Sequence, residues 1–352
     1  MVKYIGSKRA LLPWIVETIE IIRTVETVNT VVDLFSGSAR VGHALKAKGF
    51  EVTANDINSY AFVLARALIE ADARKYDQPY ISKILKELME VEPVFGWFTK
   101  TYCENAKYFQ PKNGAKIEAI REEIEKKYSS DTLLKDILLT SLILAADKVD
   151  STTGIQMAYL KDWAPRAQND LRLEYPPLLP GEGKAFQGDA IEMAGQLNAD
   201  IFYLDPPYNQ HSYLGNYHIW ETLVKWDNPQ TYGVAQKRID VKERKSPFNS
   251  KRKSKQAITT VLNKIKAEHI VLSFSNEGFF TLEEIENMLQ DWGYVIVLNK
   301  PHKRYIGARI GIYNPQGEKV GKISHTENQE FLFIATQSKN VYYTLKEKNK
   351  II

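Results

Sequence analysis

The sequence has almost none of the residues that build disulfide frameworks or metal centres. Among its 352 residues Cys103 is the only cysteine, which excludes a disulfide framework and a cysteine-based metal cluster. The six histidines are scattered along the chain without the spacing of metal ligands. We therefore expect no metal in the functional site.

Long hydrophobic runs are also missing. The longest apolar stretch, "ILLTSLILAA" at 137–146, is too short to span a bilayer and predicts a buried helix. The N-terminal stretch "MVKYIGSKRALL" lacks the apolar core of a secretion signal. The simplest expectation is a cytoplasmic protein with no membrane partner.

The net charge of +4 is mild, but the basic residues are unevenly distributed. Between residues 237 and 255 only Asp240 and Glu243 oppose a dense group of cations: Lys237, Arg238, Lys242, Arg244, Lys245, Lys251, Arg252, Lys253 and Lys255. Such a run is either a solvated loop or a segment that contacts nucleic-acid phosphates. Its second half, "KSPFNSKRKSK", has a proline and small polar residues, which predict a mobile arm without a stable helix that orders on binding.

The order of elements near the N-terminus predicts an α/β fold. A helix is expected at 10–24, followed by an apolar strand at 30–35 and a loop of small residues that leads into a helix ending near Gly49. A second strand at 50–56 and a helix at 58–71 follow. This β–α–β–α order predicts parallel strands in a doubly wound sheet.

A helical region interrupts the sheet. From residue 72 the chain has helical periodicity and almost no strand signal, with helices expected at 81–90, 115–128 and 131–148. Strand-like runs return at 184–189, 199–205, 269–275, 293–299 and 330–336. We therefore expect one α/β domain made of 1–71 and 184–352, with 72–183 as a mostly helical insertion.

Two strands end on carboxylates, where ligands bind in open α/β sheets. The strand "IFYL" leads directly into Asp205, and Pro206 and Pro207 then restrict the turn. Asp56 ends the second strand, about twenty residues beyond a glycine-containing loop, where an acid can accept hydrogen bonds from ribose hydroxyls. The loop does not end in the Lys–Ser/Thr pair with which phosphate-binding loops hold a nucleoside triphosphate. The pattern therefore favours a nucleoside ligand.

Seven stretches together resemble a known family. They are "KYIGSK" (3–8), "DLFSGS" (33–38), "ND" (55–56), "DPPYN" (205–209), "NYH" (216–218), "LSFSNEG" (272–278) and "EFLFIAT" (330–336). In this order they resemble the D12 class (Dam-like) of DNA adenine-N6 methyltransferases, especially the type II restriction-modification members. One departure is Ser38, which stands where many relatives carry glycine; a small residue is expected to be tolerated there.

The resemblance implies a Rossmann-like sheet that binds S-adenosyl-L-methionine. By matching positions, Lys8 would lie near the carboxylate of the cofactor, Asp56 at its ribose and Asp189 on its adenine side. The full set of implied cofactor contacts is Tyr4, Lys8, Asp33, Phe35, Ser36, Gly37, Ser38, Asp56, Asp189 and Asp205. The family order makes the insertion 72–183 the target-recognition region of an enzyme that acts on double-stranded DNA. The resemblance also implies a cognate restriction endonuclease in the same restriction-modification system, with which the protein would form no stable complex.

The chemistry of an amine explains the "DPPY" sequence. The exocyclic amine of adenine is a poor nucleophile because its lone pair is delocalised into the ring. Asp205 and the carbonyl of Pro206 can accept its hydrogens, and Pro207 keeps the turn rigid. Tyr208 would stack on the base, which must leave the duplex to be reached.

Several alternatives differ in the chemistry they need. Cytosine-C5 methylation requires a nucleophilic cysteine, and Cys103 lacks the prolyl setting of that reaction. Cytosine-N4 enzymes usually carry serine in place of Asp205, and RNA adenine methylation and a non-catalytic DNA-binding subunit also stay open. A metal-dependent nuclease could use Asp33, Asp56, Asp189 and Asp205, which fall at or near the ends of separate expected strands, but no matching nuclease spacing accompanies them.

Overall fold

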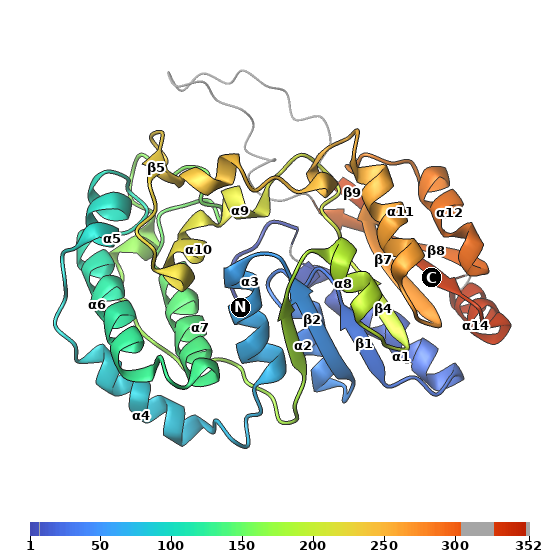
Figure 1. Cartoon of the computed structure of the whole chain (residues 1–352), viewed down its shortest axis with the longest axis horizontal. Helices are drawn as coiled ribbons and strands as arrows, with labels where there is room; N and C mark the ends of the chain where they lie inside the picture. Colours follow the sequence, from blue (N-terminus) through green and yellow to red (C-terminus); the bar gives the residue numbers. More distant parts are fainter. Residues whose placement is uncertain (7, 304–326, 350–352) are drawn as a thin grey trace.

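A seven-stranded sheet forms the centre of the protein in the computed structural model, which describes residues 1–6, 8–303 and 327–349 (Figure 1). Its strands, in spatial order, are β3 (Lys184–Gln187), β2 (Glu51–Asp56), β1 (Thr30–Asp33), β4 (Ile201–Leu204), β7 (His269–Ser275), β9 (Glu327–Thr336) and β8 (Tyr294–Lys303). The first five run parallel, and β9 runs antiparallel to both of its neighbours. This topology confirms the expected Rossmann-like α/β class.

Alternate residues of the strands face two separate hydrophobic clusters. Val31 of β1 belongs to one cluster, with α1 (Leu12–Val25), α2 (Arg40–Ala47), α3 (Ser59–Ala65) and α14 (Lys339–Asn349). Its neighbour Val32 belongs to the other, with α8 (Ala190–Gln196), α11 (Ser254–Lys264) and α12 (Leu282–Leu289). Because successive strand residues point to opposite faces, β1 is apolar on both sides and is buried between the two helical layers.

The helical region is built on four elements, α4 (Gln78–Met89), α5 (Trp97–Thr99), α6 (Pro111–Tyr128) and α7 (Thr132–Lys148). The three long helices confirm the helical insertion, but α4 and α6 start three to four residues earlier than expected. Prolines explain the difference, since Pro79 and Pro111 lie in the first turns, where a missing N–H costs nothing. No helix in the described residues has the length and apolarity that a membrane span requires.

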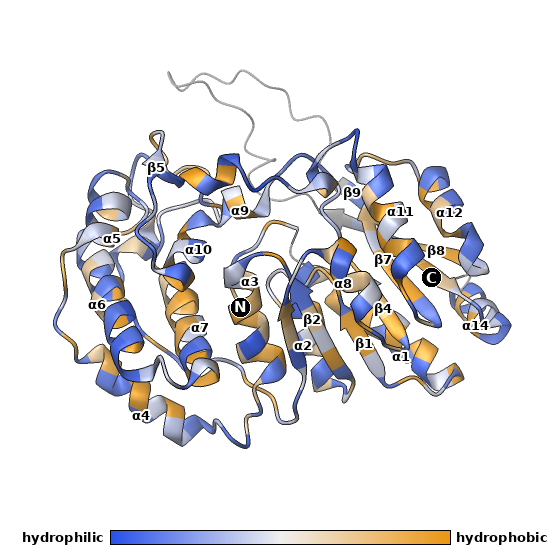
Figure 2. Ribbon diagram, in the orientation of Figure 1, coloured by the Kyte–Doolittle hydropathy of each residue, from blue (hydrophilic) through white to orange (hydrophobic). Residues whose placement is uncertain are grey.

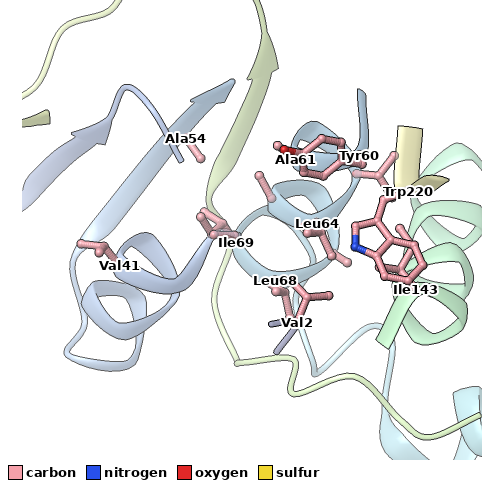
Figure 3. Packing of buried hydrophobic residues seen from close by; sticks show 14 of the residues in the cluster. Val2, Val41, Ala54, Tyr60, Ala61, Leu64, Leu68, Ile69, Ile143 and Trp220 are labelled. Carbon is pink, nitrogen blue, oxygen red and sulfur yellow. The ribbon is translucent and has the colours of Figure 1, made fainter. Parts of the chain in front are cut away.

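Apolar residues connect the insertion to the sheet. Figure 3 shows Trp220 of α10 (His218–Lys225) facing Leu64 of α3 and Ile143 of α7, all in one cluster. In the hydropathy colouring of Figure 2, β1, β4 and β7 carry much orange, and blue is frequent on the outer helices. The sheet and the helices therefore share a continuous core on this side.

The helical part also includes residues from beyond the expected boundary at 183. The buried guanidinium of Arg121 in α6 donates from Nε to the carbonyl of Leu223 in α10, at 2.6 Å. The hydroxyl of Tyr102 lies 3.1 Å from that of Thr222 on the same helix. Residues 218–225 were expected in the catalytic segment, so the structure brings a second stretch of chain to the insertion. Residues 304–326 and 350–352 of that segment lie outside the described residues.

The basic segment 237–255 packs on the rest of the protein through Arg238, Arg244 and Phe248, which differs from the expected mobile arm. The expectation of no stable helix holds for residues 245–253, where the structure has only a short 3-10 turn at Pro247–Asn249. The first residues of the segment form β6 (Lys237–Arg238), which pairs antiparallel with β5 (Thr231–Tyr232), and α11 begins at Ser254. Arg238 is 2% exposed, and its two terminal nitrogens donate to the carboxylate of Asp227 at 2.7 Å each. The charge pattern of residues 237–255 did not indicate this partner, because Asp227 lies ten residues before the segment begins. Lys251, Arg252 and Lys253 form an exposed group just before α11, and Lys242, Lys245 and Lys255 of the segment are exposed as well.

Candidate active site

A cavity of about 310 Å³ opens at the carboxyl ends of β1, β2 and β4. It is lined by eleven of the residues implied by the sequence: Tyr4, Lys8, Asp33, Phe35, Ser36, Gly37, Ser38, Asp56, Asp189, Asp205 and Pro207. Pro206 and Tyr208 are not in its lining. The structure thus gathers residues from distant stretches of the chain at one edge of the sheet, where α/β proteins bind ligands.

The turn after β1 is shaped by backbone that passes very close to an aromatic ring. Gly37 has φ +50°, and a Cβ there would lie 3.2 Å from the ring of Tyr4. Glycine is therefore needed for both conformation and space. Ser38 is 6% exposed and fits in the turn, as expected for a small residue at this departure from the family pattern.

Asp33 ends β1 as a buried carboxylate with one free oxygen. It is 1% exposed, and its Oδ2 accepts a hydrogen bond from the backbone N–H of Gly42 in α2 at 3.1 Å. Its Oδ1 has no hydrogen-bond partner in the described structure. Burial raises the pKa of Asp33 to about 7, and Asp205 and Asp56 add to the rise, whereas the Gly42 N–H opposes it.

Asp56 and Asp189 also have structural roles. Asp56 accepts from the backbone N–H groups of Gly37 and Asn58, both at 2.9 Å, and so fixes the turn to the end of β2. Burial raises the pKa of Asp56, and these hydrogen bonds oppose the rise. Asp189 caps α8 by accepting from the N–H of Ile191 at 2.8 Å. Both carboxylates still line the cavity.

Asp205 forms an ion pair that the sequence did not indicate. Nζ of Lys8 lies 3.1 Å from Oδ1 of Asp205 and 3.5 Å from Oε2 of Glu330, and the Lys8 side chain is 5% exposed. Burial raises the pKa of Asp205 to about 6, and Lys8 opposes the rise. Glu330 begins the "EFLFIAT" stretch, and only the pairing of β9 with β7 shows that it reaches this site.

Tyr208 stands beside the cavity. Its ring meets Phe274 edge-on at 5.6 Å, and Nζ of Lys8 lies 5.7 Å from the ring centroid. Its carbonyl accepts from the N–H of Phe279 at 2.9 Å, which ties the "DPPY" turn to the loop after β7. The structure therefore brings Tyr208 next to Asp205 while leaving it outside the lining of the cavity.

The N-terminal segment is held over the glycine turn by stacked aromatic rings. Tyr4 lies between Tyr217 and Tyr213, with ring centroids 4.5 and 5.3 Å away and interplanar angles of 9° and 13°. Its hydroxyl lies 3.0 Å from that of Tyr60. Such pairs are worth roughly 0.5–1.5 kcal/mol each beyond their buried area. Tyr213 lines the cavity as well, although nothing in the local sequence indicated a role for it.

Residues 243–249, here called the strap, form one wall of the cavity. Phe248 is 3% exposed and packs edge-on against Phe35 at 5.1 Å. Asn249 donates from Nδ2 to the carbonyls of Asn209 and His211 at 2.8 and 2.9 Å, so the strap also holds the loop after the "DPPY" turn. The sequence assigned these residues to a DNA-binding arm, because nothing local indicates that Phe248 folds back onto the β1 turn.

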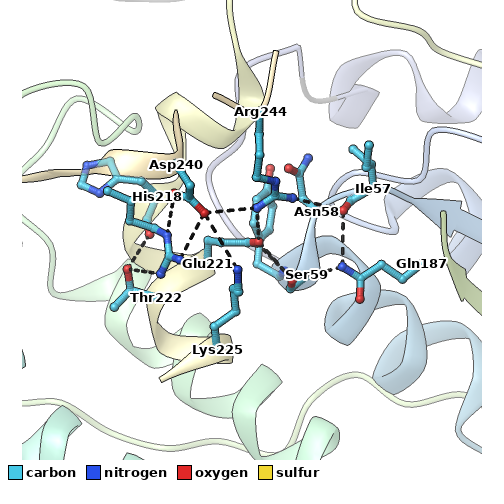
Figure 4. A network of polar contacts seen from close by, with 12 residues as sticks. Ile57, Asn58, Ser59, Gln187, His218, Glu221, Thr222, Lys225, Asp240 and Arg244 are labelled. Atoms are coloured by element: carbon cyan, nitrogen blue, oxygen red, sulfur yellow. Dashed lines mark hydrogen bonds and ion pairs between the residues drawn. The ribbon is translucent and has the colours of Figure 1, made fainter. Parts of the chain in front are cut away.

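A buried glutamate anchors the strap (Figure 4). Glu221 is fully buried and accepts from Arg244 of the strap at 2.8 Å. It also accepts from the hydroxyl of Ser59 at 3.0 Å and from the N–H of Tyr60 at 3.1 Å. The N-terminus of α3, the strap and α10 are thereby fixed together beside Asp56.

The strand-end aspartates do not form a metal centre. In the ranges that the structure describes, no group of three or more His, Cys, Asp or Glu side chains is placed to hold a metal ion. Cys103 is buried among apolar residues, and burial raises the pKa of its thiol. Neither arrangement supports the nuclease or the cysteine-based alternative.

Known proteins resemble this chain over most of its length. The sequence model of the D12 class N6 adenine-specific DNA methyltransferases matches residues 4–288. Modification methylase StsI of Streptococcus sanguinis is 32% identical over 86% of this chain and 48% of its own length. Type II methyltransferase M.FokI of Planomicrobium okeanokoites is 31% identical over 86% of this chain and 49% of its own length.

The chain spans about half the length of these two curated relatives. It covers 92% of type II methyltransferase M.CviAII of Paramecium bursaria Chlorella virus 1, which is 31% identical over 86% of this chain. The family model and this nearly full-length match agree with the glycine turn and the "DPPY" turn at one cavity. The chain belongs to the D12 class N6 adenine-specific DNA methyltransferase family.

Proposed function

We propose that the protein transfers a methyl group from S-adenosyl-L-methionine to the exocyclic N6 of adenine at a specific sequence in double-stranded DNA. The observation that carries the proposal is the position of Asp205, which lies at the carboxyl end of β4 and lines the same cavity as the glycine turn. An amine acceptor and a nucleoside-binding turn are therefore neighbours.

The residues of the cavity suit S-adenosyl-L-methionine, which when bound supplies an electrophilic methyl group on a sulfonium. Several buried polar atoms in the lining have no hydrogen-bond partner in the described structure, among them Asp33 Oδ1, Ser36 Oγ and Asn55 Oδ1. Such atoms destabilise a protein unless a ligand or water satisfies them. Asp56 would accept from the ribose hydroxyls, and Asp189, which lines the same cavity, would lie on the adenine side.

The "DPPY" turn would activate the target amine. Asp205 and the carbonyl of Pro206 would accept its two hydrogens, which moves the nitrogen toward a tetrahedral shape and frees its lone pair. Pro207 restricts the turn, so little ordering is needed when the base arrives. Tyr208 would stack on the flipped base, an interaction worth about 1–3 kcal/mol.

Two regions would contact DNA. The helical insertion 72–183, together with α10 packed on it, would read the target sequence. The exposed group Lys251, Arg252 and Lys253 would contact phosphates. We further propose that the protein is the modification enzyme of a restriction-modification system, works in the cytoplasm on the bacterial chromosome and forms no stable complex with its endonuclease.

Methylation-sensitive sequencing of DNA from cells that express the protein would test this function. We expect N6-methyladenine at one short motif, and none in cells that express Asp205→Ala at the same level. N4-methylcytosine at the motif would assign the cytosine reaction instead. Methylated RNA with unmodified DNA would assign an RNA substrate, and unmodified nucleic acids would favour the non-catalytic subunit.

A further inference from the structure

Four basic residues line the cavity, and they differ in whether an acid already pairs with them. They are Lys8, Arg40, Arg244 and Lys245. Lys8 lies between Asp205 and Glu330, and Arg244 pairs with the buried Glu221. Lys245 is exposed on the strap. Lys8 and Arg244 therefore already have carboxylate partners within the protein.

Arg40 has no such partner among the described residues. The one contact of its guanidinium is a long hydrogen bond of 3.3 Å from Nη2 to the carbonyl of Val2. Its Nε is buried without a hydrogen-bond partner. Burial and the charge of Arg9 lower the pKa of Arg40, which is the effect expected for a cation that lacks an anion nearby. A partly buried guanidinium of this kind favours an anionic ligand.

Asp33 lies at the other end of the same turn and has the opposite requirement. The N–H of Gly42 fixes its Oδ2, and the buried Oδ1 is left as an acceptor without a donor. Asp33 and Arg40 thus line one cavity, and each has a buried side-chain atom without a hydrogen-bond partner in the described structure. An α-amino acid carries one carboxylate and one ammonium on neighbouring atoms and matches both.

We propose that Arg40 binds the α-carboxylate of the methionine part of the cofactor while Asp33 Oδ1 accepts from its ammonium. The proposal rests on the proposed function and replaces Lys8 as the carboxylate partner. Arg40 is also the first residue of α2, so a carboxylate beside it meets the positive end of the helix dipole. Lys8 is left to hold Asp205 and Glu330.

Calorimetry with three ligands would test the assignment without measuring catalysis. The ligands are S-adenosyl-L-methionine, its decarboxylated form, which keeps the ammonium, and 5′-methylthioadenosine, which lacks both charged groups. Arg40→Met should weaken S-adenosyl-L-methionine by about 10- to 100-fold and leave the other two ligands within about twofold. Asp33→Asn should weaken both ammonium-bearing ligands and spare 5′-methylthioadenosine.

Lys245→Met is the matched control, since it removes another cation from the cavity wall, and it should affect no ligand selectively. Arg40→Lys should recover part of the affinity for S-adenosyl-L-methionine, and it replaces Arg40→Met as the test variant if Arg40→Met does not fold. Equal loss of all three ligands in both Arg40 variants, no loss in Arg40→Met, or a selective loss in Lys245→Met would overturn the inference alone. Failure of the wild-type protein to bind any of the three would overturn the proposed cofactor as well.

Discussion

Nζ of Lys8 lies 3.1 Å from Oδ1 of Asp205, so the proposed amine acceptor is paired with a buried cation. Glu330 shares the same ammonium at 3.5 Å. Burial alone would lower the pKa of Lys8, but the two carboxylates raise it well above its usual value. Lys8 therefore stays charged and helps to keep Asp205 ionised in a site that otherwise favours the neutral acid.

The pH dependence of methyl transfer should report Asp205. Burial raises its pKa to about 6, with Lys8 and Glu330 as its charged neighbours. Only the ionised carboxylate accepts both from Lys8 and from the amine, so the single-turnover rate should be flat well above pH 6, reach half of its plateau at about pH 6 and fall further at lower pH. Asp205→Ala should abolish transfer and keep cofactor affinity within a few fold, whereas full activity of this variant would contradict the acceptor role.

Tyr208 is predicted to act through its ring. Tyr208→Ala should lower the rate by at least about tenfold, because a stacking partner worth about 1–3 kcal/mol is removed. Tyr208→Phe and Tyr208→Trp keep an aromatic face and should lose much less. Single-turnover assays with saturating DNA would measure this, and a loss in Tyr208→Phe as large as in Tyr208→Ala would show that the hydroxyl matters instead.

Asp56 should contribute equally to every ligand that contains the ribose. Asp56→Ala should weaken S-adenosyl-L-methionine and 5′-methylthioadenosine alike, by about 1.5–3 kcal/mol, the range for hydrogen bonds to a charged group. Since Asp56 also holds Gly37 and Asn58, Asn58→Ala is the control for a loosened turn. Unchanged affinity in Asp56→Ala by calorimetry would remove this carboxylate from the site.

The exposed basic group should contribute to DNA binding without reading sequence. Changing Lys251, Arg252 and Lys253 to Ala should lower the affinity for duplexes with and without the target sequence by similar factors. The slope of log affinity against log salt concentration should become shallower by about 0.9 for each phosphate that the variant no longer neutralises. The control changes Lys339, Lys346 and Lys348 of α14 to Ala, which removes the same charge from exposed positions elsewhere. A wild-type salt slope in the first variant would identify the group as a solvated loop.

Elements whose signals are local could be predicted from the sequence. Apolar runs that end in Asp56 and Asp205 predicted parallel strands with a ligand at their carboxyl ends, because such strands are buried on both faces and meet at one edge. Helical periodicity predicted the insertion in the same way, and the family was indicated by the resemblance of the ordered motifs to those of known members. These features depend on neighbours a few residues apart.

The pairing of charges and the choice of segments that cover the site depend on tertiary contacts. Glu330 meets Lys8 only because β9 inserts beside β7, and Phe248 meets Phe35 only because the strap folds back over the β1 turn. Arg238 and Arg244, counted as DNA-binding cations, are instead paired with Asp227 and Glu221. A buried charge requires a partner at hydrogen-bond distance, and which residue provides it depends on three-dimensional packing between segments that are separate in the sequence.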